Sequence, residues 1–442
     1  MIGHLGYGLV EGFYGPPWSL ETRRTVVRHL GEAGLTTYFY APKSDPKHRD
    51  RWWEPLSAGE RVELESLFEA GRSAGVRVVY GIAPERLMLS GNLRVRSERD
   101  LSKEGAHALA ERILDVAALG GRDFAVLFDD TLATLAPFLA GERKGRAHGL
   151  VARFVEDTLA QRVRDARVFV VPAVYHGRAS EASAGALAYL RGLAGVVGTM
   201  PAAWTGPRIF SNWISDTDLV ARSRATGLSL WIWNNLIAND WLPLASGEAL
   251  GARGSQRLAF GPVDNVGDAV VDASRGILLN GAREPMLSVI SAATLAELVR
   301  DRHAYDPRSA FDRALARVGG PRALEVVGDL HTWVARHPLA APHRGGGRRL
   351  DDVLADVERG TRPRSAALEI CDRLTTLEQR LTATLGASPL AAELRPTALK
   401  LELVGRAVRA TLEGDSSASE LARRARAVRW QTDLDGALSR IR

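Results

Sequence analysis

The pattern of apolar and polar residues divides the chain into two parts. In the first two thirds, short runs rich in β-branched and aromatic residues alternate with stretches in which apolar residues recur every three or four positions. This alternation predicts strand–helix units around a parallel sheet. The predicted strands are Tyr7–Val10, Thr36–Tyr40, Arg77–Ile82, Phe124–Phe128, Val168–Val174, Val196–Trp204, Ser229–Trp233 and Gly276–Leu279.

Eight such units lie within about 280 residues, which is the size and strand count of a (β/α)8 barrel. We therefore expect an α/β protein with a (β/α)8 barrel, a TIM barrel, over residues 1–300. The seventh unit is irregular, because a long connection runs from Trp241 to Asp264. The predicted helices of this part include Leu20–Glu32, Gly59–Ser73, Leu101–Ala118 and His148–Arg164.

After Arg300 the strand-like runs disappear, and apolar residues recur at helical spacing among Ala, Leu, Arg and Glu. We expect a C-terminal all-α helical bundle domain over residues 301–442, with about five helices. One apolar stripe indicates bundle core rather than a partner surface, and it consists of Leu374, Leu377, Leu381 and Leu385. The expected helix breaks lie near Pro321, His343–Gly347, Pro363, Ser388–Pro389 and Gly414–Ser417.

Composition is that of an ordinary globular protein, with 442 residues, 45% hydrophobic and 25% charged. Charged residues interrupt every apolar run before the roughly 20 residues that a membrane span needs. The N-terminus also lacks the pattern of a secretory signal, so we expect a cytoplasmic protein with no membrane partner. The single cysteine, Cys371, excludes an internal disulfide and a zinc site made of cysteines. Its apolar neighbours predict a buried thiol.

The formal charge of +6 does not by itself indicate a nucleic-acid partner. A nucleic-acid binder concentrates its basic residues on one face or in one run, whereas the arginines here are spread along the chain. The nearest approach to a run is Arg344–Arg349, either a phosphate-binding loop or a solvated connection. We expect no nucleic-acid partner. The sequence is compatible with a homo-oligomer but specifies no oligomeric state.

Candidate chemistry collects at the ends of the predicted strands, where active sites of (β/α)8 barrels lie. Carboxylates, amides, a lysine and aromatic rings suit a carbohydrate, because planar rings stack on sugar faces while Asp and Asn bind vicinal hydroxyls. Gly12 and Gly15 follow the first strand without a GxGxxG pattern, which argues against a dinucleotide. The strand-end residues are Glu11–Gly15, Lys43, Asp129, Asp130, Tyr175, His176, Trp204, Thr205, Asn234, Asn235, Asp240 and Asn280.

Asp129 and Asp130 close an apolar run and so emerge from buried backbone. One interpretation is a strand terminator in which an aspartate caps the next helix, and a second is a magnesium site. The third is acid–base catalysis, because repulsion between adjacent carboxylates separates their proton affinities and leaves one donor and one acceptor. Neighbouring residues of a strand face opposite ways, so both carboxylates reach one substrate only if the strand ends or bends at Asp129.

Several segments form longer motifs that a known family shares. Near the N-terminus they are Gly8–Gly15 with Pro17-Trp18, and Tyr40–Lys43 with Asp45 and Lys47–Arg49. Further along they are Phe128–Asp130, Tyr175, Trp204–Pro207, Trp233–Asn235 with Asn239-Asp240, and Gly276–Asn280. In this order they resemble glycoside hydrolase family 84, which includes the protein O-GlcNAcases. The resemblance covers about residues 6–300. The helical region that follows is similar to the family's helical domain only in its general composition and its helical spacing of apolar residues.

This resemblance implies a retaining β-N-acetylglucosaminidase that acts by substrate-assisted catalysis, in which the acetamido oxygen of the sugar attacks C1 and forms an oxazoline. By their places in the motifs, Asp129 polarises the acetamido N–H, and Asp130 protonates the leaving oxygen and later activates water. Tyr175 hydrogen-bonds the acetamido group. No metal and no cofactor is implied. The implied substrate-binding residues are Gly12, Lys43, Trp204, Thr205, Trp233, Asn235, Asp240 and Asn280.

Two alternatives to an O-GlcNAcase stay open at the level of sequence. A catalytically silent sugar-binding protein would keep the same residues for the sugar, although intact Asp129, Asp130 and Tyr175 argue against it. The same reaction could also act on cell-wall, chitin or hyaluronan fragments. In each case the expected partner is a GlcNAc-containing glycoside or glycoprotein.

Overall fold

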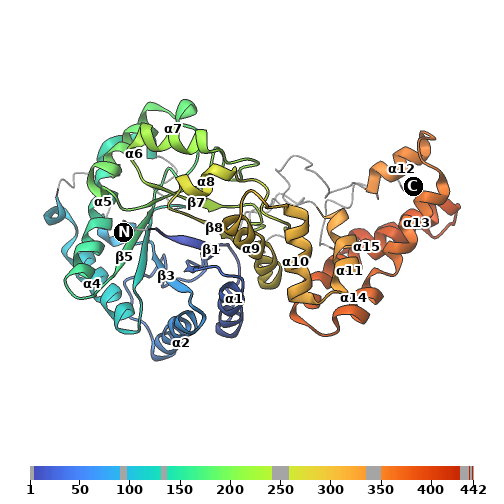
Figure 1. Ribbon diagram of the computed structural model, residues 1–442, viewed down its shortest axis with the longest axis horizontal. Coiled ribbons are helices and arrows are strands. Elements are labelled where there is room, and N and C mark those ends of the chain that lie inside the picture. The colour runs from blue at the N-terminus through green and yellow to red at the C-terminus, as the bar shows by residue number, and fades with distance from the viewer. Residues whose placement is uncertain are drawn as a thin grey trace. The chain divides into compact units, whose positions relative to one another are not determined.

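Eight parallel strands form a closed barrel in sequence order, as the sequence predicts (Figure 1). The computed structural model describes residues 4–89, 97–130, 137–240, 258–334 and 350–428, with 438 and 441. Each strand pairs with its sequence neighbours, and β1 pairs with β8 to close the barrel. The strands are β1 (Gly6–Glu11), β2 (Thr37–Tyr40), β3 (Arg77–Ile82), β4 (Asp123–Leu127), β5 (Arg167–Val171), β6 (Ala202–Trp204), β7 (Leu230–Asn234) and β8 (Gly276–Asn280).

Helices follow the strands and surround the barrel (Figure 1). They are α1 (Leu20–Glu32), α2 (Ala58–Ala74), α3 (Glu85–Met88), α4 (Lys103–Ala118), α5 (Pro137–Ala160), α6 (Ala184–Val197), α7 (Asp216–Thr226) and α8 (Asp268–Ala273). After β8 the chain forms α9 (Pro285–Arg300), which the two compact units described below share. Several of these helices begin or end at residues whose side chains or backbone conformations favour a helix terminus. Ser19, Ser57 and Ser215 each accept a hydrogen bond from the backbone N–H three residues on, which caps α1, α2 and α7. Gly75 and Gly227 end α2 and α7 in the left-handed conformation.

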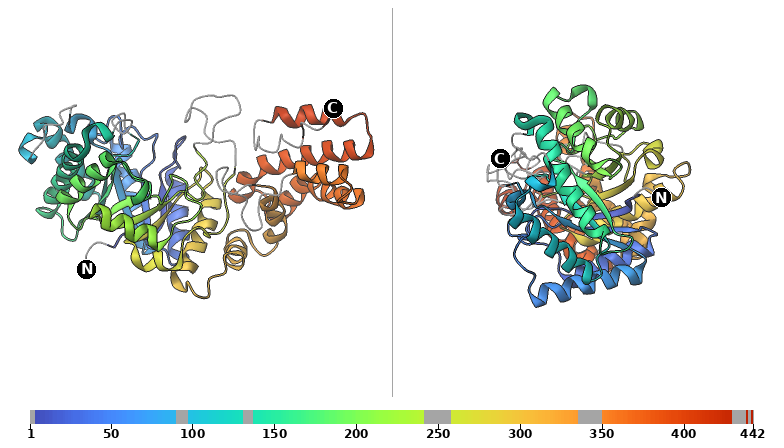
Figure 2. Two further views of the ribbon diagram at one scale, coloured as in Figure 1. Left: turned by 90° about the horizontal axis from the view of Figure 1, so that it is seen from above. Right: turned by 90° about the vertical axis from the view of Figure 1, so that its left-hand side faces the viewer.

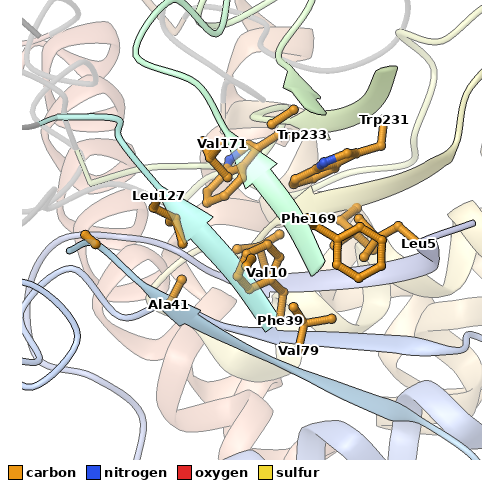
Figure 3. Close-up of a cluster of buried hydrophobic side chains, with 14 residues drawn as sticks. Leu5, Val10, Phe39, Ala41, Val79, Leu127, Phe169, Val171, Trp231 and Trp233 are labelled. Carbon is orange, nitrogen blue, oxygen red and sulfur yellow. The ribbon is translucent and has the colours of Figure 1, made fainter. Parts of the chain in front are cut away.

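Inward-facing residues of the strands fill the barrel. Trp231 and Trp233 lie two residues apart in β7, and both rings belong to the interior cluster because side chains of a strand alternate with a period of two (Figure 3). Their ring centroids lie 5.9 Å apart, and the Phe39 ring lies 6.0 Å from Trp231 and 5.8 Å from Trp233. The ring at the C-terminal end of β7 is therefore supported by the layer of side chains beneath it.

The predicted strands all exist, but the sixth begins later than expected. Val196 and Val197 are the last residues of α6, and only Ala202–Trp204 forms a strand. A short apolar run does not by itself distinguish a strand from the buried face of a helix, and Gly198, with φ of 59°, ends the helix. The prediction of the helix Leu20–Glu32 is confirmed at both ends.

The chain separates into two compact units that interleave along the sequence. The first comprises Met1–Leu236, Val263–Gly281 and Leu295–Tyr305 and contains the barrel. The second comprises Ile237–Pro262, Ala282–Thr294 and Asp306–Arg442. A division into domains at residue 300 therefore stays a proposal.

The second unit is helical from Asp306 onward, as predicted for the residues after Arg300. Within it α15 contacts α13, α14 and α16, and Figure 2 shows these helices in orange to red. The helices are α10 (Pro307–Gly319), α11 (Ala323–Trp333), α12 (Leu350–Glu358), α13 (Arg364–Thr375), α14 (Leu377–Leu385), α15 (Pro389–Glu413) and α16 (Ala418–Ala427).

The described residues after Arg300 thus contain seven helices, so the expected five is too low. One unexpected break lies at Thr376, between α13 and α14, and it divides the predicted leucine stripe. All four leucines of the stripe are nonetheless buried, which confirms their place in the core.

Three further expectations concern single features. Cys371 is buried, as predicted, and burial raises the pKa of its thiol to about 12. In the described part of the chain, no helix combines the length and the apolar character needed to cross a membrane. The break at His343–Gly347 and the Arg344–Arg349 run lie outside the described residues, as does most of the Trp241–Asp264 connection.

Candidate active site

Asp129 and Asp130 lie just past the C-terminal end of β4, in a turn that separates them from the strand. β4 ends at Leu127, and Asp130 adopts the left-handed conformation with φ of 51°, which is uncommon for a residue other than glycine. Asp129 is buried, whereas the side chain of Asp130 is 30% exposed. The strand thus ends before the pair, which is the condition for both carboxylates to reach one substrate.

The Lys43 ammonium joins the two carboxylates. Its Nζ lies 3.1 Å from Asp130 Oδ2 and donates a shorter hydrogen bond to Asp129 Oδ2. The rings of Tyr14 and Trp233 have their centroids 5.9 Å from the same nitrogen, within the range of a cation–π interaction. A buried cation therefore lies between two carboxylates and two aromatic rings.

These charges set the ionisation of Asp130. Burial alone would raise the pKa of Asp130, but the charges of Lys43 and Arg49, with hydrogen bonds from Lys43 and Tyr14, hold that pKa below its ordinary value. The sequence led us to expect one protonated carboxyl in the pair. For Asp130 the structure differs, because two cations compensate the repulsion between the carboxylates.

Two tyrosines donate to Asp130. Tyr14 Oη lies 3.1 Å from Oδ2, and Tyr175 Oη lies 3.2 Å from Oδ1. Burial raises the pKa of Tyr14 to about 12 and, together with the carboxylate charges, raises the pKa of Tyr175 further. Both hydroxyls therefore remain donors. Tyr175 is a predicted site residue, whereas Tyr14 is one that the sequence placed only within a strand-end motif.

Arg49 contacts the pair from the backbone side. Its Nη2 donates to the Asp129 carbonyl at 2.5 Å and lies 3.5 Å from Asp129 Oδ1, and its Nη1 donates to the Asp130 carbonyl at 3.4 Å. The sequence alone predicts no role for Arg49. The available signal was its position in the same motif region as Lys43.

Trp233, Asn235 and Asn280 form a hydrogen-bonded group at the ends of β7 and β8. Trp233 Nε1 donates to Asn235 Oδ1 at 3.0 Å, and Asn280 Nδ2 donates to the same oxygen at 2.9 Å. Asn280 Oδ1 is buried and has no hydrogen-bond partner within the described ranges. Gly12 fits tightly here, because a Cβ at this position would lie 2.5 Å from Trp233 Cζ2 and 2.9 Å from Asn280 Oδ1. The structure thus brings these four predicted residues together.

Trp204 and Thr205 hold the turn after β5. Thr205 N donates to the Tyr175 carbonyl at 2.8 Å, and Trp204 Nε1 donates to the Gly177 carbonyl at 3.2 Å. Trp204 is fully buried, so a contact between its ring and an acetyl group stays a prediction. These two residues support Tyr175.

Asp240 belongs to the second compact unit, where it is buried. Its role as a sugar ligand stays a prediction. In the parts of the chain that the structure describes, no three side chains of His, Cys, Asp or Glu converge in the manner of a metal site.

The fold and these side chains together define a class of protein. A closed (β/α)8 barrel that presents paired carboxylates, a lysine, amides and aromatic rings at the C-terminal ends of its strands is built as a carbohydrate-active hydrolase is. Comparison with known proteins gives the particular family.

The family model described as beta-N-acetylglucosaminidase matches residues 7–331. The chain belongs to this family, glycoside hydrolase family 84, which places it among the glycoside hydrolases. It is 28% identical over 291 residues to the protein O-GlcNAcases of Rattus norvegicus and Mus musculus. Each match covers 65% of this chain and 29% of the relative, so the chain spans less than a third of their length.

Two solved structures share the fold over 98% of this chain. CpGH84B has a TM-score of 0.76 at 21% identity, with 76% of that chain covered. A mutant O-GlcNAc hydrolase of Thermobaculum terrenum has a TM-score of 0.78 at 20% identity, with 94% of that chain covered. These likenesses confirm the barrel followed by a helical region.

Proposed function

We propose that the chain is a retaining β-N-acetylglucosaminidase that removes terminal β-linked GlcNAc by substrate-assisted catalysis through an oxazoline. The observation that carries the proposal is the Asp129–Asp130 pair around Lys43 at the end of β4. Because the nucleophile belongs to the sugar, the protein needs only to polarise the acetamido group and to move protons. A carboxylate pair with tyrosine donors is suited to both tasks.

In the first step the acetamido carbonyl oxygen attacks C1 while the bond from C1 to the aglycone oxygen breaks. Asp129 accepts a hydrogen bond from the acetamido N–H and stabilises the positive charge that grows there. Asp130 gives its proton to the departing oxygen. In the second step Asp130 takes a proton from water, whose oxygen bonds to C1 and opens the oxazoline. Tyr175, which already donates to Asp130, donates to the acetamido oxygen.

Lys43 has to separate from Asp130 before the first step. Without a sugar its charge holds Asp130 ionised, which is the form needed in the second step and not in the first. We infer that the bound sugar moves the ammonium away from Asp130. Loss of that charge raises the pKa of Asp130 and lets it take up a proton.

The remaining strand-end residues suit the sugar itself. A buried acceptor without a partner is costly, so Asn280 Oδ1 is well placed for a sugar hydroxyl. Trp233 lies next to Lys43 and offers an apolar surface to the acetyl methyl group. We assign Gly12, through its backbone carbonyl, together with Lys43, Trp204, Thr205 and Asn235, to the rest of the sugar. For Asp240 the role of a sugar ligand stays a prediction from the family motif.

For the natural substrate we propose GlcNAc on protein, in the cytoplasm. The support is the similarity to relatives named protein O-GlcNAcase. Cell-wall, chitin and hyaluronan fragments are the alternatives. Release of GlcNAc from an O-GlcNAc peptide, compared with release from chitobiose and from a hyaluronan oligosaccharide, decides between them.

Turnover of 4-nitrophenyl β-GlcNAc tests the activity, with 4-nitrophenyl β-glucoside as the control that lacks the acetamido group. A catalytically silent sugar-binding protein would bind GlcNAc and release no nitrophenol from either compound. For the mechanism, the acetyl hydrogens are replaced by one, two and three fluorines. Each fluorine makes the attacking oxygen less basic, so the rate should fall stepwise. A flat response, together with a glycosyl ester trapped on Asp129 or Asp130, would overturn the proposed mechanism.

A further inference from the structure

We infer that Arg49 is a positioning residue that holds the Asp129–Asp130 turn in the conformation in which both carboxylates face one substrate. The inference rests on the proposed function for what the carboxylates do. Its structural basis is independent, because it depends on contacts that Arg49 makes with the backbone of the turn. No role is otherwise assigned to this side chain.

The guanidinium group contacts two successive residues of the turn. Nη2 donates to the Asp129 carbonyl at 2.5 Å, and Nη1 donates to the Asp130 carbonyl at 3.4 Å. Nη2 also lies 3.5 Å from Asp129 Oδ1. A planar group with donors in a fixed fork can bind both carbonyls at once. Arg49 therefore restrains the backbone on both sides of the bond that joins the two aspartates.

The turn needs such a restraint. Asp130 adopts a φ of 51°, in the left-handed region that glycine enters readily and aspartate only occasionally. In a continued strand the two side chains would face opposite ways. Strained conformations persist only where the surrounding structure fixes them, and the two carbonyl contacts of Arg49 supply that constraint.

The connection that carries Arg49 is itself anchored to the barrel. On one side, Tyr40 Oη donates to Asp45 Oδ2 at 2.7 Å. On the other, Ala83 N donates to the His48 carbonyl at 2.9 Å, and His48 Nδ1 lies 2.9 Å from the Gly81 carbonyl. Arg49 thus extends from a connection fixed to β2 and β3, and its position relative to the end of β4 is set by the barrel.

One atom of Arg49 indicates that packing alone does not explain its place. Its Nε is buried and has no hydrogen-bond partner among the residues that the structure describes, and the whole side chain is 11% exposed. A buried donor without a partner lowers the stability of the fold. The contacts of Nη1 and Nη2 with the turn offset part of that cost, as expected of a residue that positions the turn.

Arg49→Lys and Arg49→Met test the inference. Lysine keeps the positive charge but lacks the planar pair of N–H donors that binds both carbonyls, whereas methionine lacks both. The matched control is Arg51→Met, since Arg51 lies in the same connection with its side chain 56% exposed and paired with Glu54. With 4-nitrophenyl β-GlcNAc we expect kcat to fall about 10²-fold in both Arg49 variants, the cost of a misplaced catalytic group, with KM within about threefold of wild type. The fall in kcat should be larger with methyl β-GlcNAc, which has a poorer leaving group.

The pH profile of kcat separates a positioning role from a structural one. The groups that face Asp130 are Lys43, Arg49, Tyr14, Tyr175 and Asp129. Arg49 contributes to the lowered pKa of Asp130, so its loss in Arg49→Met should move the basic limb of the profile to higher pH. In Arg49→Lys that limb should stay in place although kcat is low.

Three outcomes overturn the inference, and a fourth contradicts the proposed function. Folded Arg49 variants with wild-type kcat overturn it, as does a rise in KM that matches the fall in kcat, because Arg49 would then bind the sugar. Failure of both variants to fold, with Arg51→Met intact, also overturns it in favour of a structural role. An inactive wild type contradicts the proposed function instead, whereas an active wild type with unaffected Arg49 variants contradicts only this inference.

Discussion

Lys43 Nζ lies 3.1 Å from Asp130 Oδ2 while it also binds Asp129, so one ammonium group serves both carboxylates of the site. With Arg49 on the backbone side, two cations face two anions. This balance explains how two adjacent aspartates share a mostly buried site at the end of β4. It also means that the acid step depends on breaking one of these ion pairs.

Lys43→Met should therefore change the pH dependence as well as the rate. Lys43 lowers the pKa of Asp130, so its removal raises that pKa, and the protonated acid persists to higher pH. Because the bound sugar already moves Lys43 away from Asp130, the shift belongs to the free enzyme, and we expect the basic limb of the kcat/KM profile to move to higher pH. We also expect kcat/KM to fall at least tenfold, because a sugar contact is lost. Initial rates on 4-nitrophenyl β-GlcNAc from pH 4 to 9 measure both. The control is Lys103→Met, because Lys103 is an exposed residue of α4. A basic limb that stays in place or moves to lower pH contradicts the prediction.

Asp130→Asn should be most damaging for substrates with poor leaving groups. A general acid matters least when the departing oxygen is already a weak base, and removal of such a group costs about 10² to 10⁴ in rate. The loss of kcat/KM should be larger for methyl β-GlcNAc than for the nitrophenyl glycoside. Asp216→Asn, at an exposed residue of α7, serves as the control. Equal losses on both substrates would show that Asp130 is not the acid.

A half-buried acid in the second unit predicts a pH-dependent stability. Glu393 of α15 accepts hydrogen bonds from Met286 N at 2.8 Å and Leu287 N at 3.0 Å, in the first turn of α9. Burial raises the pKa of Glu393 to about 8 and that of its neighbour Glu284 to about 7, while Arg283 and Asn239 act on Glu284 in the opposite direction. Both values exceed the ordinary value of 4.5.

The folded state then binds more protons than the unfolded chain between about pH 4.5 and 8. The free energy of unfolding of this unit should fall as pH rises through that window, by on the order of 1 kcal/mol per pH unit for each acid. Glu393→Gln should reduce the slope, whereas Glu413→Gln, in the last turn of the same helix, should not. Denaturant titrations at pH 5, 6, 7 and 8 measure the slope. Stability that rises with pH in the wild type contradicts the sign.

The barrel can be predicted from the sequence because each strand is recognisable from its own short segment, without knowledge of the rest of the fold. Most strands are short runs rich in β-branched and aromatic residues, and every predicted strand except the third is followed by polar or aromatic residues. The sixth strand is the exception, since Val196 and Val197 satisfy a helix and a strand equally well until the place of Gly198 is known. Periodicity alone cannot decide such a run.

The site is predicted in its residues and less well in its connections. Lys43, Asp129, Asp130 and Tyr175 come together as expected. The left-handed turn at Asp130 and the carbonyl contacts of Arg49 could not be predicted, because they depend on how a connection after β2 reaches the end of β4 in three dimensions. The compensation of the two aspartates by Lys43 and Arg49 likewise depends on how the folded chain brings these four residues together.

Gly12→Ala tests how tightly the sugar-binding end of the barrel is built. A Cβ at residue 12 would lie 2.5 Å from the Trp233 ring and 2.9 Å from Asn280 Oδ1, both too close. Trp233 cannot easily yield, because it packs on Phe39 and donates to Asn235, and such overpacking typically costs about 1 to 3 kcal/mol. If Trp233 borders the acetyl group, displacement of its ring by the new Cβ narrows the pocket for that group. We then expect kcat/KM to fall at least tenfold on the N-acetyl substrate and further on its larger N-propanoyl analogue. Gly59→Ala, where an added Cβ meets nothing within 4 Å, is the matched control. Equal losses on the two acyl substrates would show that Trp233 does not border the acyl group.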